Sequence, residues 1–299
     1  MEILIGLLRL FAAIVIAFIS GKLISRLKLP AILGWLIAGM ILGPHALGLL
    51  NNALLEAPWF ETTESLLECT VGLMIGTELI WSQMKKAGSQ ILITTITESL
   101  GTFFVVSLVF GIIFWVTDVP VYLAFMFGGI ALATAPAPSL SIVSELKTSG
   151  PVTKTLIPMA ALDDLVGALV FFLVIAFVSA HISNAGVPVP IVLLLVFLPV
   201  VIGGITGFIA GKLLRHTKTA ESTLTVMILM LLVSAGIGFA INSMLPVHVL
   251  NFMLIGMAYS TVFANMVTEE QLNGMMKVMN PVIGFSLIVA ILNLAAPLD

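Results

Sequence analysis

The sequence predicts an all-α polytopic membrane protein with about ten transmembrane helices, and three observations support this class. Hydrophobic residues make up 60% of the 299 residues and charged residues only 9%, far from the balance of soluble domains. Long apolar runs recur along the chain, with short loops between them. Basic residues gather in alternate loops. Because the loops leave no room for a soluble domain, we expect residues 1–299 to form one transmembrane domain.

Each expected helix is an apolar run of the length that crosses a bilayer, about 20 residues. In chain order the runs occupy residues 3–24, 29–49, 63–82, 89–116, 121–146, 155–180, 188–214, 221–244, 246–265 and 278–298. The first run lacks a basic start and a small-residue cleavage pattern, and Arg9 interrupts it. We therefore expect a retained helix rather than a signal peptide.

Apart from Arg9, the basic residues lie at or just beyond the ends of the odd-numbered runs. They are Lys22, Arg26 and Lys28 after the first, Lys85 and Lys86 after the third, Lys147 and Lys154 after the fifth, Lys212, Arg215 and Lys218 after the seventh, and Lys277 after the ninth. The positive-inside rule then places both termini on the outer side. We expect an integral protein of the plasma (cell) membrane, in contact with membrane lipid.

Composition also excludes several functions. The net charge is −3, and no basic run or Cys/His metal spacing occurs, which argues against nucleic-acid partners and structural zinc. The single cysteine, Cys69, cannot form an internal disulfide. No nucleophile–base pairing or phosphate loop is visible, so an enzyme is disfavoured.

Two segments resemble each other and run in opposite directions across the membrane. LPAILGWLIAGM occupies residues 29–40 and LPVHVLNFMLIGM residues 245–257. This pair predicts an inverted repeat, with a first copy at about 29–180 and a partial second copy at about 245–299. Chance is the alternative, because these residue types are common in membrane helices. If the repeat is real, three helices of the second copy are absent, so either the chain is truncated or a second chain completes the fold.

The fifth run contains the sequence ATAPAPSLS at residues 133–141. Pro136 and Pro138 lack an N–H and clash with the preceding turn, which predicts an unwound segment within the helix. Unwound backbone at membrane depth is tolerated where it is buried in protein or lines a cavity, and its carbonyls can coordinate a cation. A simple proline kink is the alternative.

Two adjacent carboxylates, Asp163 and Asp164, interrupt the apolar run at 155–180. They lie about 14 Å along a helix from Lys154, near the middle of a hydrocarbon layer about 30 Å thick. One aspartate there costs about 2.5–3.5 kcal/mol, so the pair needs water, a cation or a proton. The sequence therefore predicts an ion or proton path, unless both residues lie at a helix end in solvent.

Four motifs in order carry a family resemblance: LKLPAILGWLIAGMILGPHALG, GLMIGTEL, ALATAPAPSLSIVSELK and ALDDLVG. Together they resemble the monovalent cation:proton antiporters of the sodium/proton exchanger superfamily. The resemblance implies an inverted-repeat antiporter fold, no cofactor, and exchange of protons for Na+, Li+ or K+ through an elevator-like movement of a core domain against a dimerisation domain. It also implies a homodimer.

The same resemblance assigns roles to residues. Asp164 resembles the carboxylate that binds both the monovalent metal cation and the proton, Asp163 its partner, and Thr134 a contributor of an oxygen ligand. Glu78 falls where some members place another acidic group. The broken-helix motif comprises Ala135, Pro136, Ala137 and Pro138. The paired aspartates resemble the electrogenic branch, whose members continue beyond the position of Asp299, so the resemblance implies a C-terminally incomplete chain.

Two other functions compete with the antiporter. The chain is an inactive or partner-dependent fragment or subunit if its missing helices are essential. An organic-anion:sodium symporter on the same fold is the other alternative, and it is disfavoured because adjacent carboxylates suit a small cation better than an anion.

Overall fold

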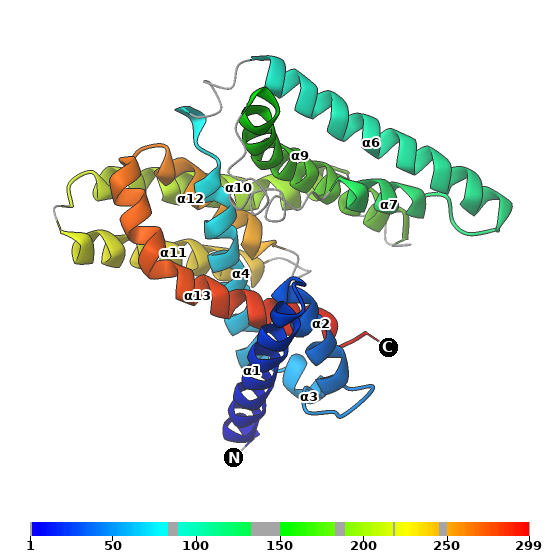
Figure 1. Cartoon of the computed structure of the whole chain (residues 1–299), viewed down its shortest axis with the longest axis horizontal. Coiled ribbons are helices and arrows are strands. Elements are labelled where there is room, and N and C mark those ends of the chain that lie inside the picture. Colours follow the sequence, from blue (N-terminus) through cyan, green and yellow to red (C-terminus); the bar gives the residue numbers. More distant parts are fainter. Residues whose placement is uncertain are drawn as a thin grey trace. The chain divides into compact units, whose positions relative to one another are not determined.

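The structure is a computed structural model that describes residues 2–82, 89–132, 150–182, 189–217, 219–244 and 250–298. These residues form helices, with no strand among them. Figure 1 labels the helices α1 (Glu2–Arg26), α2 (Ala31–Leu42), α3 (Asn52–Leu55), α4 (Pro58–Glu78), α6 (Ser89–Val116), α7 (Leu123–Ala131), α9 (Pro151–Ile182), α10 (Val189–Leu214), α11 (Ala220–Asn242), α12 (Phe252–Ala264) and α13 (Glu269–Ala295).

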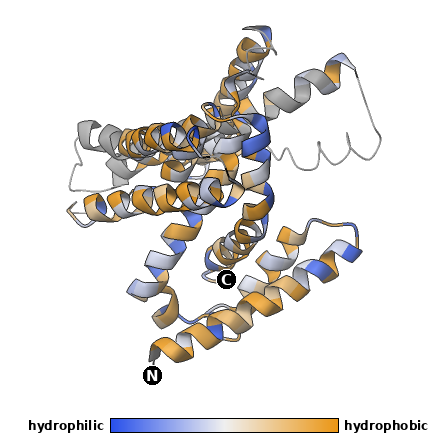
Figure 2. Cartoon of the chain, turned by 90° about the vertical axis from the view of Figure 1, so that its left-hand side faces the viewer, coloured by the Kyte–Doolittle hydropathy of each residue, from blue (hydrophilic) through white to orange (hydrophobic). Residues whose placement is uncertain are grey.

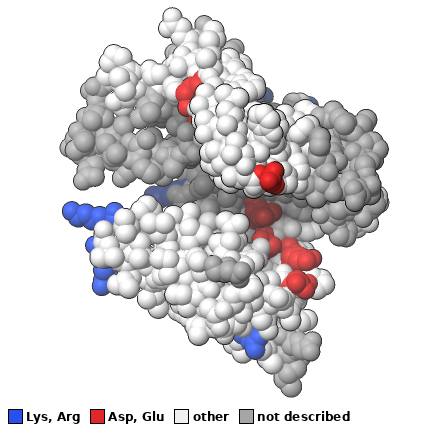
Figure 3. Space-filling model, turned by 90° about the vertical axis from the view of Figure 1, so that its right-hand side faces the viewer, with Lys and Arg blue, Asp and Glu red and all other residues white. Residues whose placement is uncertain are grey.

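Apolar composition agrees with a polytopic membrane protein. Within the described ranges, five helical stretches are long and apolar enough to cross a membrane: 3–26, 90–116, 197–214, 220–242 and 269–295. Apolar residues dominate the helix that starts at the N-terminus in Figure 2. Most described side chains on the face shown in Figure 3 are uncharged, and the charged ones gather in separate patches.

Helix ends differ most from the expected runs where local backbone chemistry decides them. α2 ends at Leu42 rather than near residue 49, because Pro44 favours extended backbone at Gly43, whose ψ is 175°. α13 begins at Glu269 rather than near residue 278, because Thr268 and Gln271 form a capping box. Lys277 therefore lies inside a helix and not in the loop before it.

The chain divides into two compact units, and each is described by itself. Unit 1 comprises Met1–Thr77 and Val200–Asp299, and unit 2 comprises Glu78–Pro199.

The core of unit 1 includes a buried cluster in which α1, α2 and α13 meet, with Ala13, Ala38 and Leu292 among its members. α2 approaches α13 closely at Gly39, where an added Cβ would lie 2.6 Å from the Cβ of Ala295. Glycine is needed there because the two helix backbones leave no room for a side chain.

α12 is the most deeply buried helix of unit 1. It packs closely against α4 and α10 at glycines, one on α12 and one on α10. A Cβ at Gly256 would lie 1.9 Å from the carbonyl oxygen of Cys69 on α4, and one at Gly207 on α10 would lie 2.3 Å from that of Tyr259. The Tyr259 hydroxyl donates a 2.8 Å hydrogen bond to the carbonyl of Met227 on α11. These contacts fix α12 against three neighbours.

Unit 2 is built on α6, α7 and α9. Aromatic rings join the three helices: Phe110 on α6 stacks on Phe127 of α7 with centroids 4.4 Å apart, and Phe125 of α7 contacts Phe177 of α9 edge-on at 5.8 Å. Such ring pairs stabilise packing by about 0.5–1.5 kcal/mol beyond the area they bury. They hold α7 between its two longer partners.

Candidate ion-binding site

Asp163 lies in α9, which begins at Pro151. Proline suits this first position because its missing N–H needs no partner there and its ring presets the helical φ. Asp163 follows 12 residues later, about 18 Å along the helix. Asp163 is only 4% exposed.

Ser99 on α6 is the described hydrogen-bond partner of Asp163. The Ser99 hydroxyl donates to Oδ1 of Asp163, and Ser99 is 1% exposed. Thr95, one turn earlier on α6, is also fully buried and donates back to the carbonyl of Ile91 at 2.9 Å. α6 therefore presents a narrow hydroxyl-bearing face to α9.

The sequence alone does not identify Ser99, which stands next to an acidic residue, Glu98, in the same apolar run. The Glu98 side chain is exposed, and its Oε1 accepts a 3.4 Å hydrogen bond from Thr102 on the same helix. Successive helix positions differ by about 100°, so Ser99 faces Asp163 and Glu98 points elsewhere. The four-residue spacing of Thr95 and Ser99 was the available signal.

Gly167 brings the end of α7 against α9, one helical turn beyond Asp163. A Cβ at Gly167 would lie 3.3 Å from the carbonyl oxygen of Leu132, the residue that directly precedes the proline motif. The chain thus leaves α7 within about one turn of Asp163 before it continues into residues 133–141.

The other predicted site residues lie wholly or partly outside the described residues. Thr134 and the motif Ala135, Pro136, Ala137 and Pro138 belong to the segment 133–149, which is outside them. Asp164 continues α9, and Glu78 is the last residue of α4, but their side chains are not described. The roles of these residues therefore stay predictions.

In the described part of the chain, no three His, Cys, Asp or Glu side chains gather as a multidentate metal site. Asp163 and Ser99 together offer carboxylate and hydroxyl oxygens, the donors that hard cations prefer.

The family model described as sodium/hydrogen exchanger, transmembrane, matches residues 12–298, which is nearly the whole chain. No curated protein sequence matches the chain. The family match agrees with the resemblance of the four motifs and with the apolar helices. The chain therefore belongs to the sodium/hydrogen exchanger family, integral membrane transporters that exchange cations for protons.

Proposed function

We propose that this protein exchanges protons for Na+, Li+ or K+ at a site formed by Asp163 and Asp164, with Asp164 as the carboxylate that binds the proton and the metal cation in turn. The observation that carries the proposal is the burial of Asp163 within α9, with Ser99 as its hydrogen-bond donor. A carboxylate at that depth is costly unless it binds a proton or a cation.

The chemistry of the pair suits this exchange. An ionised carboxylate offers about four lone-pair sites, and the Ser99 hydroxyl occupies one of those of Asp163. A cation and a proton need the same lone pairs and therefore compete for the sites that remain. Thr134 is proposed to add an oxygen, Glu78 a further acidic group, and the segment Ala135–Pro138 its unwound carbonyls.

The division of the chain into two units supports an alternating movement, and the packing within unit 1 supports the inverted repeat. Asp163 and Ser99 both belong to unit 2, so the proposed site can travel with one body. In unit 1, α2 packs on α13 at Gly39 and α12 packs on α4 at Gly256, so these two helices of each proposed copy pair with those of the other copy. That reciprocity favours the inverted repeat of residues 29–180 and 245–299. A homodimer in the plasma membrane with both termini outside completes the proposal.

The direct test is exchange by purified protein in vesicles that hold a pH gradient. Addition of Na+, Li+ or K+ is expected to dissipate the gradient, and the cation giving half-maximal rate at the lowest concentration is the preferred one. A gradient unaffected by all three cations contradicts the proposed function.

Replacing Ser99 by alanine is expected to weaken cation binding without abolishing exchange. The change removes a hydrogen bond to a charged group, which contributes about 1.5–3 kcal/mol, and 1.4 kcal/mol corresponds to a tenfold change in affinity. The half-saturating cation concentration should therefore rise about tenfold or more. Ser234→Ala, which removes a buried hydroxyl of α11 in unit 1, is the control and should leave that concentration unchanged.

A further inference from the structure

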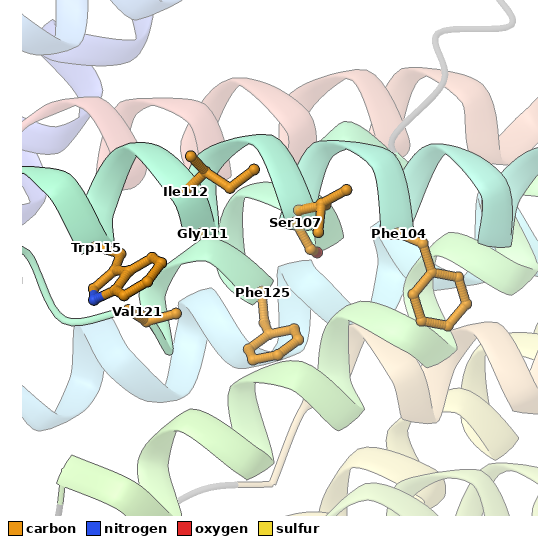
Figure 4. Close-up of a pocket in the computed structure, with 8 residues that line it drawn as sticks. Phe104, Ser107, Gly111, Ile112, Trp115, Val121 and Phe125 are labelled. Carbon is orange, nitrogen blue, oxygen red and sulfur yellow. The ribbon is translucent and has the colours of Figure 1, made fainter.

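An open apolar groove of about 550 Å³ runs along one side of unit 2, between α6 and α7. Its walls are the side chains of Phe104, Leu108 and Trp115 from α6, together with Val121 from the turn before α7 and Phe125 from α7 (Figure 4). The volume falls within the range of small-molecule sites, about 300–1,000 Å³.

Small residues make the floor of this groove. Ser107 and Gly111 are the small members of its lining on α6. α7 comes close beneath them, because a Cβ at Gly128 would lie 2.0 Å from the Ser107 Oγ. Phe125 is held in place by stacking on Phe103, with centroids 6.3 Å apart. The groove is therefore preformed by the packing of α6 on α7.

The rim of the groove is exposed and apolar. Phe104, Leu108 and Trp115 are 63%, 66% and 78% exposed. α6 is long and apolar enough to cross a membrane, and exposed apolar side chains on such a helix suit contact with hydrocarbon. An open groove with an apolar rim suits an apolar ligand.

Length and polarity identify the part of a lipid that fits. Phe104 and Trp115 are 11 residues apart, about 16 Å along α6, which matches one leaflet of a hydrocarbon layer about 30 Å thick. Trp115 ends the groove beside the turn at Asp118, and tryptophan prefers the headgroup level. The Ser107 hydroxyl is the polar side chain of the lining; it is 8% exposed and has no hydrogen-bond partner among the described residues.

We propose that this groove binds one acyl chain of a phospholipid, with the headgroup at the turn after α6 and the chain extending past Gly111 toward Phe104. The leaflet is the one that contains this turn, which the charge pattern predicts to be the outer one. The bound chain fills space that α6 and α7 leave open, in the same unit that carries Asp163.

The test uses the full chain in vesicles of phosphatidylethanolamine and phosphatidylglycerol that contain a trace of phospholipid with a diazirine in mid-chain. After illumination, mass spectrometry maps the lipid adducts. We expect the peptide spanning residues 104–125 to carry more adducts than the lipid-exposed helix α1. Equal labelling of both regions would show only the ordinary lipid annulus and would overturn the proposal.

Gly111→Leu fills the groove with little strain, because the nearest atoms to its new Cβ, on Ala124 and Val121, are 3.9 Å away. Adducts at 104–125 should fall about tenfold, since the leucine takes the place of about two methylenes of the chain. Gly101→Leu is the matched control on the same helix, where a Cβ meets nothing within 4 Å, and it should change nothing.

Undiminished labelling in Gly111→Leu would contradict the proposal. The Ser107→Ala variant distinguishes an acyl chain from a polar ligand in the groove. Labelling that persists in this variant supports an acyl chain, whereas a loss as large as that in Gly111→Leu would assign the groove to a ligand that bonds to the hydroxyl and would overturn the proposal.

Discussion

Asp164→Asn is expected to abolish cation:proton exchange while leaving the protein folded. An amide has nearly the size of the carboxylate, but it neither takes up a proton at neutral pH nor supplies the negative charge that balances a cation. With no group that can alternate between the two ligands, addition of cation should leave a pH gradient across the vesicle membrane intact. The rate of gradient dissipation measures this directly.

Asp118→Asn is the matched control for this prediction. Asp118 belongs to unit 2, and its φ of 56° is one that asparagine also adopts readily. The substitution is chemically identical but lies in the turn after α6, so exchange should proceed at the wild-type rate. Exchange that survives Asp164→Asn would remove the proposed site.

Gly256→Ala is expected to cause the largest loss of stability. The new Cβ would lie 1.9 Å from the carbonyl oxygen of Cys69 and 2.7 Å from its carbonyl carbon, and backbone atoms cannot rotate away. α12 must then move away from α4, and overpacking typically costs about 1–3 kcal/mol, and more where backbone atoms clash as they do here. The melting temperature of the protein in detergent, followed by size-exclusion chromatography, should fall markedly.

Gly274→Ala is the control for the packing prediction. It lies within α13 of unit 1, and its Cβ meets nothing within 4 Å. Alanine favours helix over glycine by about 1 kcal/mol, so this variant should melt at or above the wild-type temperature. A Gly256→Ala protein that melts with the wild type would refute the close packing of α12 on α4.

The sequence predicted long helices well because the thickness of the bilayer sets their length. The expected run 89–116 coincides with α6, and the expected run 155–180 lies inside α9. Hydropathy did not predict the helix ends that local backbone chemistry decides. The start of α13 depends on the capping side chains of Thr268 and Gln271, and the end of α2 depends on Pro44. These are local backbone effects that a count of apolar residues cannot detect.

The candidate site was predictable only in part. Asp163 stands out from sequence because an acid within an apolar run is costly. Ser99 does not, because the partner of a buried carboxylate depends on how α6 and α9 pack and in which register. The approach of Gly167 to Leu132 is likewise a product of packing. Glycine and serine are common in membrane helices, so neither identifies its role without three-dimensional contacts.

In the proposed mechanism, a proton and an alkali cation compete for the oxygens of Asp163 and Asp164. Isothermal titration of Na+, Li+ and K+ into the purified protein at several pH values tests it most directly. At pH values where the free site is protonated, each bound cation must displace a proton. The apparent affinity for the cation should then fall about tenfold per unit decrease in pH for each proton displaced. Affinity that does not change with pH, or no binding of any of the three cations, would rule out competition between proton and cation at these carboxylates.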